Sequence, residues 1–123
     1  MLRKPKPANV KRISPRLRVL YGDEIALGPG KADLLAVVAE TGSIREAADR
    51  MGMSYMRAWK LIKTMNACFK EPLVEAVRGG RAYGGTSLTR TGRRALRLYQ
   101  QLTKDCLEVT ATRWKELKAL LRD

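Results

Sequence analysis

Apolar residues in the segment 41–66 recur at spacings of three and four, which is the period of an amphipathic helix. Gly52 interrupts the pattern, and glycine readily adopts the left-handed conformation that ends a helix. Ser43 and Ser54 stand where helix N-caps are needed, and Glu46 follows Ser43 by three residues, as in a capping box. The pattern predicts two short helices joined by a tight turn. Their inward faces carry Ile44, Ala47, Ala48, Met51, Met53, Ala58, Leu61, Ile62 and Met65.

The second of these helices has a polar and basic outward face. This face carries Ser54, Tyr55, Arg57, Lys60 and Lys63, which the apolar spacing excludes from the inward side. The recognition helix of a helix-turn-helix presents such side chains to base edges in the major groove of DNA. An ordinary solvated helix face is the competing interpretation. The capping residues, the tight turn and the small residues between the helices favour DNA binding.

Shorter elements are predicted before this helix pair. Arg16–Tyr21 alternates basic and apolar residues like a strand, and Ile25–Leu27 can return as a second strand after the turn at Gly22. Gly28, Pro29 and Gly30 then break the chain, and a compact helix is expected over Lys31–Glu40. This helix would be the first of a three-helix DNA-binding core.

A wing is predicted after the helix pair. Leu73–Val77 and Thr86–Leu88 have strand-like composition and flank a glycine-rich basic loop. The loop lacks the GxxxxGK(S/T) and GxGxxG spacings, so nucleotide binding is disfavoured. We expect contacts with the DNA backbone or minor groove from Ser43, Arg45, Arg78, Arg81, Thr86 and Arg90.

Thr89 is expected to cap a long final helix that extends to Leu121. Its apolar residues recur at alternating spacings of four and three, which is typical of a helix that packs against another helix. Packing within the monomer is the alternative to dimerisation. We expect dimerisation through Tyr99, Leu102, Cys106 and Val109.

Trp59 belongs to the predicted recognition helix. We expect it to pack near Ile62 on that helix rather than to stack on DNA bases.

These elements predict a mainly α fold with a small β-sheet: a winged helix-turn-helix with a long C-terminal dimerisation helix. Residues 1–15 form a basic arm that we expect to be flexible, residues 16–92 the DNA-binding domain, and residues 93–123 the dimerisation helix.

Composition supports a polyanionic partner, since 25 Lys and Arg against 12 Asp and Glu give a formal net charge of +13. Double-stranded DNA is the first candidate. No run of about 18 apolar residues and no signal-peptide pattern occurs, so we expect no membrane partner and a cytoplasmic location. With no histidine and two distant cysteines, the chain lacks the familiar zinc spacings, and we expect no metal, no cofactor and no enzymatic activity.

Several segments together resemble the N-terminal DNA-binding domain of ModE-type, molybdenum-responsive transcriptional regulators, which share a winged helix with the LysR type. The segments are GKADLL, TGSIREAA, MGMSYMRAW, KTMN, PLVEAVRGG, the Gly84–Gly85 pair and LTRTG. The resemblance implies a homodimeric winged helix that binds a palindromic operator, with Ser54, Tyr55 and Arg57 at or near bases.

Two departures from the family pattern matter. Ala82 and Tyr83 interrupt the glycine-rich wing, and the chain ends where the family's molybdate-binding domain would begin. A standalone regulator, a separate effector-sensing polypeptide, and a role unrelated to molybdenum remain open alternatives. The competing function is that of an architectural or nucleoid-type protein, which binds DNA with little sequence specificity.

Overall fold

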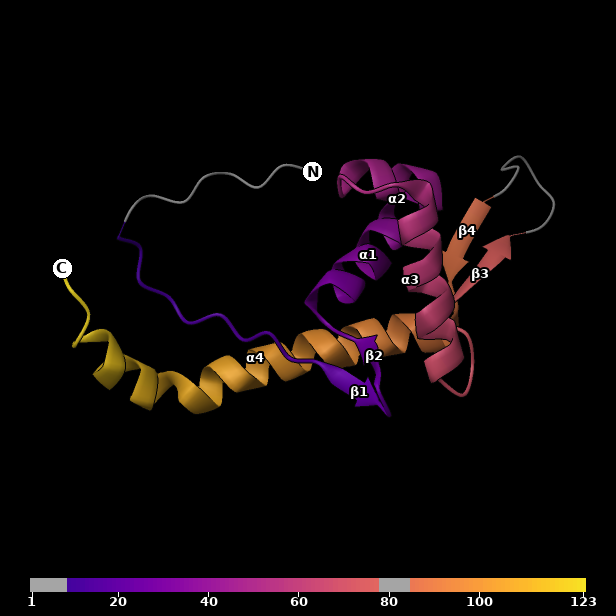
Figure 1. Cartoon of the computed structure of the whole chain (residues 1–123). Helices are drawn as coiled ribbons and strands as arrows, with labels where there is room; N and C mark the ends of the chain where they lie inside the picture. Colours follow the sequence, from indigo (N-terminus) through magenta and orange to yellow (C-terminus); the bar gives the residue numbers. More distant parts are fainter. Residues whose placement is uncertain (1–8, 78–84) are drawn as a thin grey trace.

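The computed structural model describes residues 9–77 and 85–123. The elements, in chain order, are β1 (Val19–Tyr21), β2 (Glu24–Leu27), α1 (Pro29–Thr41), α2 (Ile44–Arg50), α3 (Tyr55–Cys68), β3 (Val74–Val77), β4 (Gly85–Leu88) and α4 (Arg90–Lys118). Helices α1 to α3 pack over the first part of α4, and the rest of α4 extends away from them (Figure 1). The predicted mainly α winged helix-turn-helix is confirmed. Its β-structure consists of two separate antiparallel hairpins, β1–β2 and β3–β4.

The hydrophobic core lies where the three short helices meet the base of the wing. Leu34, Leu35 and Val38 of α1 are fully buried, as is Leu73 at the entrance to β3. Alanines stand where α2 crosses α3: Ala47, Ala48 and Ala58 are buried completely or almost completely. Because a methyl group occupies so little space, the two helices can cross closely, as the sequence predicted.

Side-chain caps define the helix starts. Ser43 Oγ accepts a hydrogen bond from the N–H of Glu46, and Ser54 Oγ accepts one from the N–H of Arg57, both at 3.1 Å. The capping box is not reciprocal, because the N–H of Ser43 donates to Thr41 Oγ1 at 3.2 Å. Gly52 has a φ of 66°, in the left-handed region, as the turn between α2 and α3 requires.

Several predicted boundaries were wrong. The last helix ends at Lys118 rather than Leu121. Helix α1 begins at Pro29 rather than Lys31, because proline fits the first helical position, where no N–H is needed for an intrahelical bond. The first strand covers only Val19–Tyr21, since its partner β2 is four residues long and pairs with no residue before Val19. Arg16–Arg18 therefore lies outside the hairpin.

The start of α4 is fixed directly to the backbone before β3. Thr89 donates from its N–H to the carbonyl of Leu73 at 2.9 Å and from Oγ1 to the carbonyl of Pro72 at 2.7 Å. Gly92 allows this approach, because a Cβ at that position would lie 2.0 Å from the Leu73 carbonyl oxygen. The wing and the long helix are thus held as one unit.

Much of α4 contacts no core. Of its 29 residues, only Gly92 and Tyr99 are buried. Residues 9–18 follow the helix in extended form, with Lys11 Nζ 3.8 Å from Asp123 Oδ1 at its far end (Figure 1). The described part of the predicted arm therefore lies beside the C-terminal half of α4.

Candidate nucleic-acid interface

Helix α3 presents a row of cations to solvent. Arg57, Lys60 and Lys63 are exposed and follow one another at spacings of three, so they form an oblique row along the helix. Ser54 and Tyr55 are exposed at its N-terminus. The structure therefore brings together all five residues predicted for the recognition helix, although Ser54 Oγ also serves as the helix cap.

Arg45 extends this surface from α2. Its guanidinium carbon lies 5.0 Å from the centroid of the Tyr55 ring, a distance typical of a cation–π contact. Ser43 is half-buried at the N-cap of the same helix. The contact places a cation from the first helix of the motif beside the start of the second.

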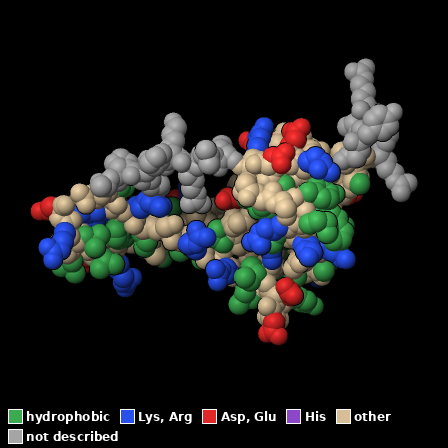
Figure 2. Space-filling view, turned by 45° about the horizontal axis from the view of Figure 1, so that its top comes forward, with side chains coloured by type: hydrophobic (Ala, Val, Ile, Leu, Met, Phe, Trp, Pro, Cys, Tyr) green, Lys and Arg blue, Asp and Glu red, His purple; other side chains and the backbone are tan. Residues whose placement is uncertain are grey.

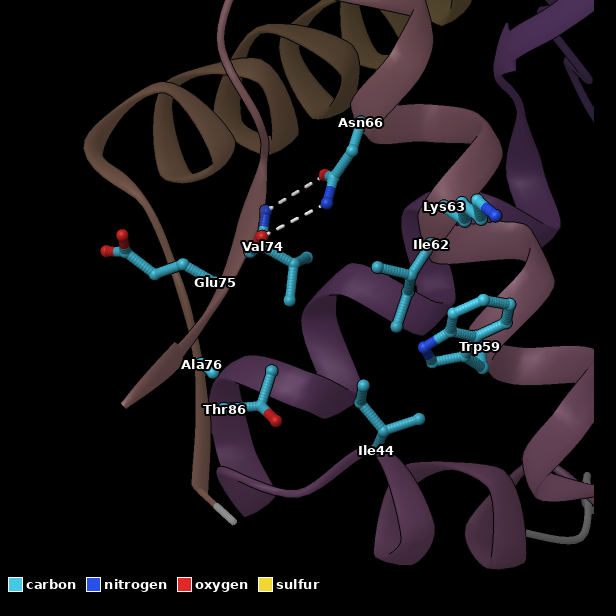
Figure 3. Close-up of a pocket in the computed structure, with 9 residues that line it drawn as sticks. All are labelled: Ile44, Trp59, Ile62, Lys63, Asn66, Val74, Glu75, Ala76 and Thr86. Carbon is cyan, nitrogen blue, oxygen red and sulfur yellow. Dashed lines mark hydrogen bonds between the residues drawn. The ribbon is translucent and has the colours of Figure 1, made fainter. Parts of the chain in front are cut away.

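The wing is attached to α3 by Asn66. Asn66 Oδ1 accepts a hydrogen bond of 2.8 Å from the N–H of Leu73. The same oxygen accepts one of 3.2 Å from the N–H of Val74, and Asn66 Nδ2 donates to the carbonyl of Val74 at 3.1 Å (Figure 3). One amide thus satisfies three backbone groups of the incoming strand. Sequence reasoning did not assign a role to Asn66, and its only signal was a polar residue four positions after the inward-facing Ile62.

An open depression of about 320 Å³ lies between α3 and the wing strands. The side chains of Trp59 and Ile62 point into it from α3, and Ile44 closes it at the start of α2 (Figure 3). Its other lining residues are Lys63, Asn66, Val74, Glu75, Ala76 and Thr86. The recognition helix and the wing are therefore neighbours across a shallow, largely apolar floor.

Two large apolar side chains on α3 are partly exposed. Trp59, predicted to pack near Ile62, leaves 38% of its surface exposed, and Lys63 Nζ lies 5.0 Å from its ring centroid. Met56 is 56% exposed and was assigned no role from the sequence. The sequence did contain a signal, because Met56 is not among the residues predicted to face inward.

Thr86 of β4, which pairs with Ala76 of β3, is buried, and this corrects its predicted place on the DNA-contacting surface. Only 8% of its surface is exposed, and its N–H donates to the carbonyl of Gly42 at 2.9 Å. The free edge of β4 meets the end of α1 at this point, so Thr86 joins the wing to the helical core. Arg90, by contrast, is exposed in the first turn of α4. Arg78 and Arg81 lie outside the described residues.

The four residues predicted for dimerisation are in different environments. Tyr99 is only 6% exposed and donates a hydrogen bond to the carbonyl of Leu17, so it belongs to the core of its own chain. Leu102 and Val109 are exposed, and Cys106 is half-buried. Leu102 borders an apolar depression of about 270 Å³, which Val19, Leu27, Phe69 and Leu98 also line.

Cationic side chains lie both on the globular end of the molecule and on the projecting length of α4. Figure 2 shows Lys and Arg side chains on the projecting length of α4 as well as on the globular end, with hydrophobic side chains at the surface of the far end of α4. Within the described ranges, no helix is long and apolar enough to cross a membrane, and no group of three potential ligands could hold a metal ion.

A helix-turn-helix followed by a two-stranded wing and a long helix defines a winged helix-turn-helix protein. Residues 31–93, just over half of the chain, match the model of the bacterial regulatory helix-turn-helix proteins of the lysR family. The chain belongs to this family.

The chain is also similar to ModE proteins, as its motifs indicated. It is 46% identical over 77 residues to the molybdenum transport protein ModE of Azotobacter vinelandii, covering 63% of this chain and 28% of the relative. It is 41% identical over 76 residues to the DNA-binding transcriptional dual regulator ModE of Escherichia coli K12, covering 62% and 29%. The chain therefore matches less than a third of the length of these relatives.

Solved structures agree on the fold. The CbnR DNA-binding domain, crystallised as a DNA complex, superimposes with a TM-score of 0.50 at 22% identity, covering 76% of this chain and 97% of that one. A LysR family transcriptional regulator gives a TM-score of 0.53 at 17% identity, covering 76% and 30%.

Proposed function

We propose that the protein is a sequence-specific transcriptional regulator that binds a palindromic DNA operator as a homodimer. The observation that carries the proposal is the exposed row of Arg57, Lys60 and Lys63 on α3, beside a wing anchored to the same helix. The similarity to the Escherichia coli ModE protein, which is described as a DNA-binding transcriptional dual regulator, supports it.

In this proposal α3 enters the major groove with its N-terminal turns near the base edges. Ser54, Tyr55 and Arg57 would contact bases there, while Lys60 and Lys63 would lie near phosphates. Arg45, which lies over the Tyr55 ring, would be near the same edge of the groove. The wing, fixed by Asn66, would approach the adjacent backbone, and Arg90 lies in the first turn of α4, where the helix dipole favours phosphate.

A second copy of the chain is the proposed partner of α4. Leu102, Val109 and Leu117 are exposed on α4, most of which has little core of its own, and Leu121 is exposed just after the helix ends. A paired helix would remove this apolar surface from water, which is the main driving force for association. Pairing two recognition helices about a two-fold axis matches a palindromic operator.

The alternative is an architectural protein that binds DNA mainly by charge. Both functions predict that affinity falls steeply with salt, because each neutralised phosphate releases counterions. They differ in specificity. Selection of bound sequences from random DNA should yield a palindromic site bound about a thousandfold or more tightly than unrelated DNA of equal length. A ratio near one would identify the architectural alternative instead.

A further inference from the structure

We infer that Met56 and Trp59 form an apolar reading surface on α3 that contacts the 5-methyl groups of thymine in the major groove. The inference rests on the proposed function, because it assigns a base preference to the helix that we propose to enter the groove. It names two specificity-determining residues beyond the polar set that the sequence indicated.

Both residues lie on the outward face of α3. Met56, Trp59, Lys60 and Lys63 occupy positions i, i+3, i+4 and i+7, which share one side of a helix. Met56 and Trp59 leave 56% and 38% of their surfaces exposed, and both lysines are exposed. Two large apolar side chains therefore lie within the cationic face itself, where a phosphate backbone would be drawn close.

Trp59 has a defined orientation. Lys63 Nζ lies 5.0 Å from its ring centroid, and the indole points toward the depression between α3 and the wing (Figure 3). A cation over an aromatic ring is an attractive contact that restrains both groups. Ile44 and Ile62 continue the apolar surface behind the ring. The indole is thus supported by neighbouring side chains and still accessible to a ligand in the groove.

The chemistry of DNA identifies what such a surface can cover. In the major groove, bases present hydrogen-bonding groups, and thymine adds an apolar methyl group at C5. A methionine side chain has no hydrogen-bond donor for the polar edges and a tryptophan side chain has one N–H, but both are mainly apolar and gain from contact with a methyl group. The surrounding lysines favour nucleic acid over an apolar protein partner, because the face is cationic. Thymine methyl groups are therefore the ligand that matches both features.

The test replaces thymine by uracil, which removes only the methyl group. Each thymine of an operator selected from random DNA is changed singly to deoxyuridine, and the dissociation constant is measured by fluorescence anisotropy at fixed salt. We expect about a threefold to fivefold loss of affinity at the contacted thymines. The Met56→Ala and Trp59→Ala proteins should bind the thymine and uracil forms of the operator equally tightly when the substituted base is the one that the replaced residue contacts.

Control variants separate reading from folding. Trp59→Phe keeps an apolar ring and should keep discrimination against uracil, while Leu20→Ala, an exposed apolar change on β1, should leave it intact. Met56 is exposed enough that its removal should not unfold the domain. An operator that tolerates uracil at every position, or equal penalties in the wild type and both alanine variants, would overturn the inference but leave the proposed function standing. Failure to select any preferred sequence would overturn both.

Discussion

Tyr99 of α4 donates a hydrogen bond of 2.7 Å from its hydroxyl to the main-chain carbonyl of Leu17, a residue 82 positions earlier. The bond joins the long helix to the segment that precedes β1. Burial raises the pKa of the Tyr99 hydroxyl above its ordinary value of 10.0; Arg16 lowers it in part, and Asp33 raises it further. The phenol is therefore held in its protonated, donating form.

Replacing Tyr99 by Phe should lower the free energy of unfolding by about 1 kcal/mol near neutral pH, because the Leu17 carbonyl loses its donor. The folded chain retains the phenolic proton at pH values where the unfolded chain has lost it. The stabilising contribution is therefore complete below pH 10 and decreases as the pH rises through the raised pKa. Urea denaturation of both proteins at pH 7, 9 and 11 measures it. If the difference in free energy of unfolding between the two proteins were the same at pH 11 as at pH 7, the Tyr99 hydroxyl would not be its source.

Gly92→Ala should destabilise the fold by several kcal/mol, about 3 or more, because its methyl group would overlap the Leu73 carbonyl. Gly30→Ala is the matched control. Gly30 lies in the first turn of α1 with nothing within 4 Å of its added Cβ, so this change should be neutral or slightly stabilising. Thermal denaturation followed by circular dichroism compares the two. Similar melting temperatures would show that α4 can move away from Leu73 without cost.

Asn66→Asp tests how the wing is attached to α3. The carboxylate can still accept from the N–H groups of Leu73 and Val74, but it cannot donate to the Val74 carbonyl. Asn66→Ala removes all three bonds and should cost more, about 2 to 3 kcal/mol against about 1 for Asn66→Asp. Amide hydrogen exchange in β3 should accelerate in the same order. Equal exchange rates in both variants would mean that another contact holds the strand.

Arg57→Ala should reduce operator affinity by about 1 to 3 kcal/mol and relax the sequence preference at one position of each half-site. The reason is that Arg57 is exposed in the first turn of α3, which in the proposed binding mode would face the base edges. Anisotropy titrations with the operator and with single-base variants measure both effects. Uniform weakening on every sequence would instead make Arg57 a phosphate contact.

Val109→Glu should prevent the proposed dimerisation without unfolding the monomer, because Val109 is 79% exposed and has little intrachain packing to lose. Ala111→Glu adds the same charge about 200° further round the helix and should leave the dimer intact. Light scattering at micromolar concentration gives the mass of each variant. A wild-type monomer under these conditions would refute the proposed pairing of α4.

The sequence was sufficient to predict the helix-turn-helix. Ser43, Gly52 and Ser54 define its helix ends through bonds and backbone angles that involve residues within four positions. The buried alanines follow from spacing alone. These features are local, so a pattern along the chain contains the information needed to find them. The cationic row on α3 followed from the same spacing, since the inward residues of a helix determine which residues remain outside.

Only the tertiary structure decided the roles that depend on distant segments. Tyr99 belongs to a stripe that predicts helix pairing, yet residues before β1 and the helical core bury it. Thr86 is covered because β4 meets the end of α1, and Asn66 acquires its role because β3 passes its amide group. Met56 and Trp59 are exposed because none of the helices and strands in residues 9–77 and 85–123 covers that side of α3. Burial depends on which segments come together in space, and the spacing of residues along one helix does not specify this.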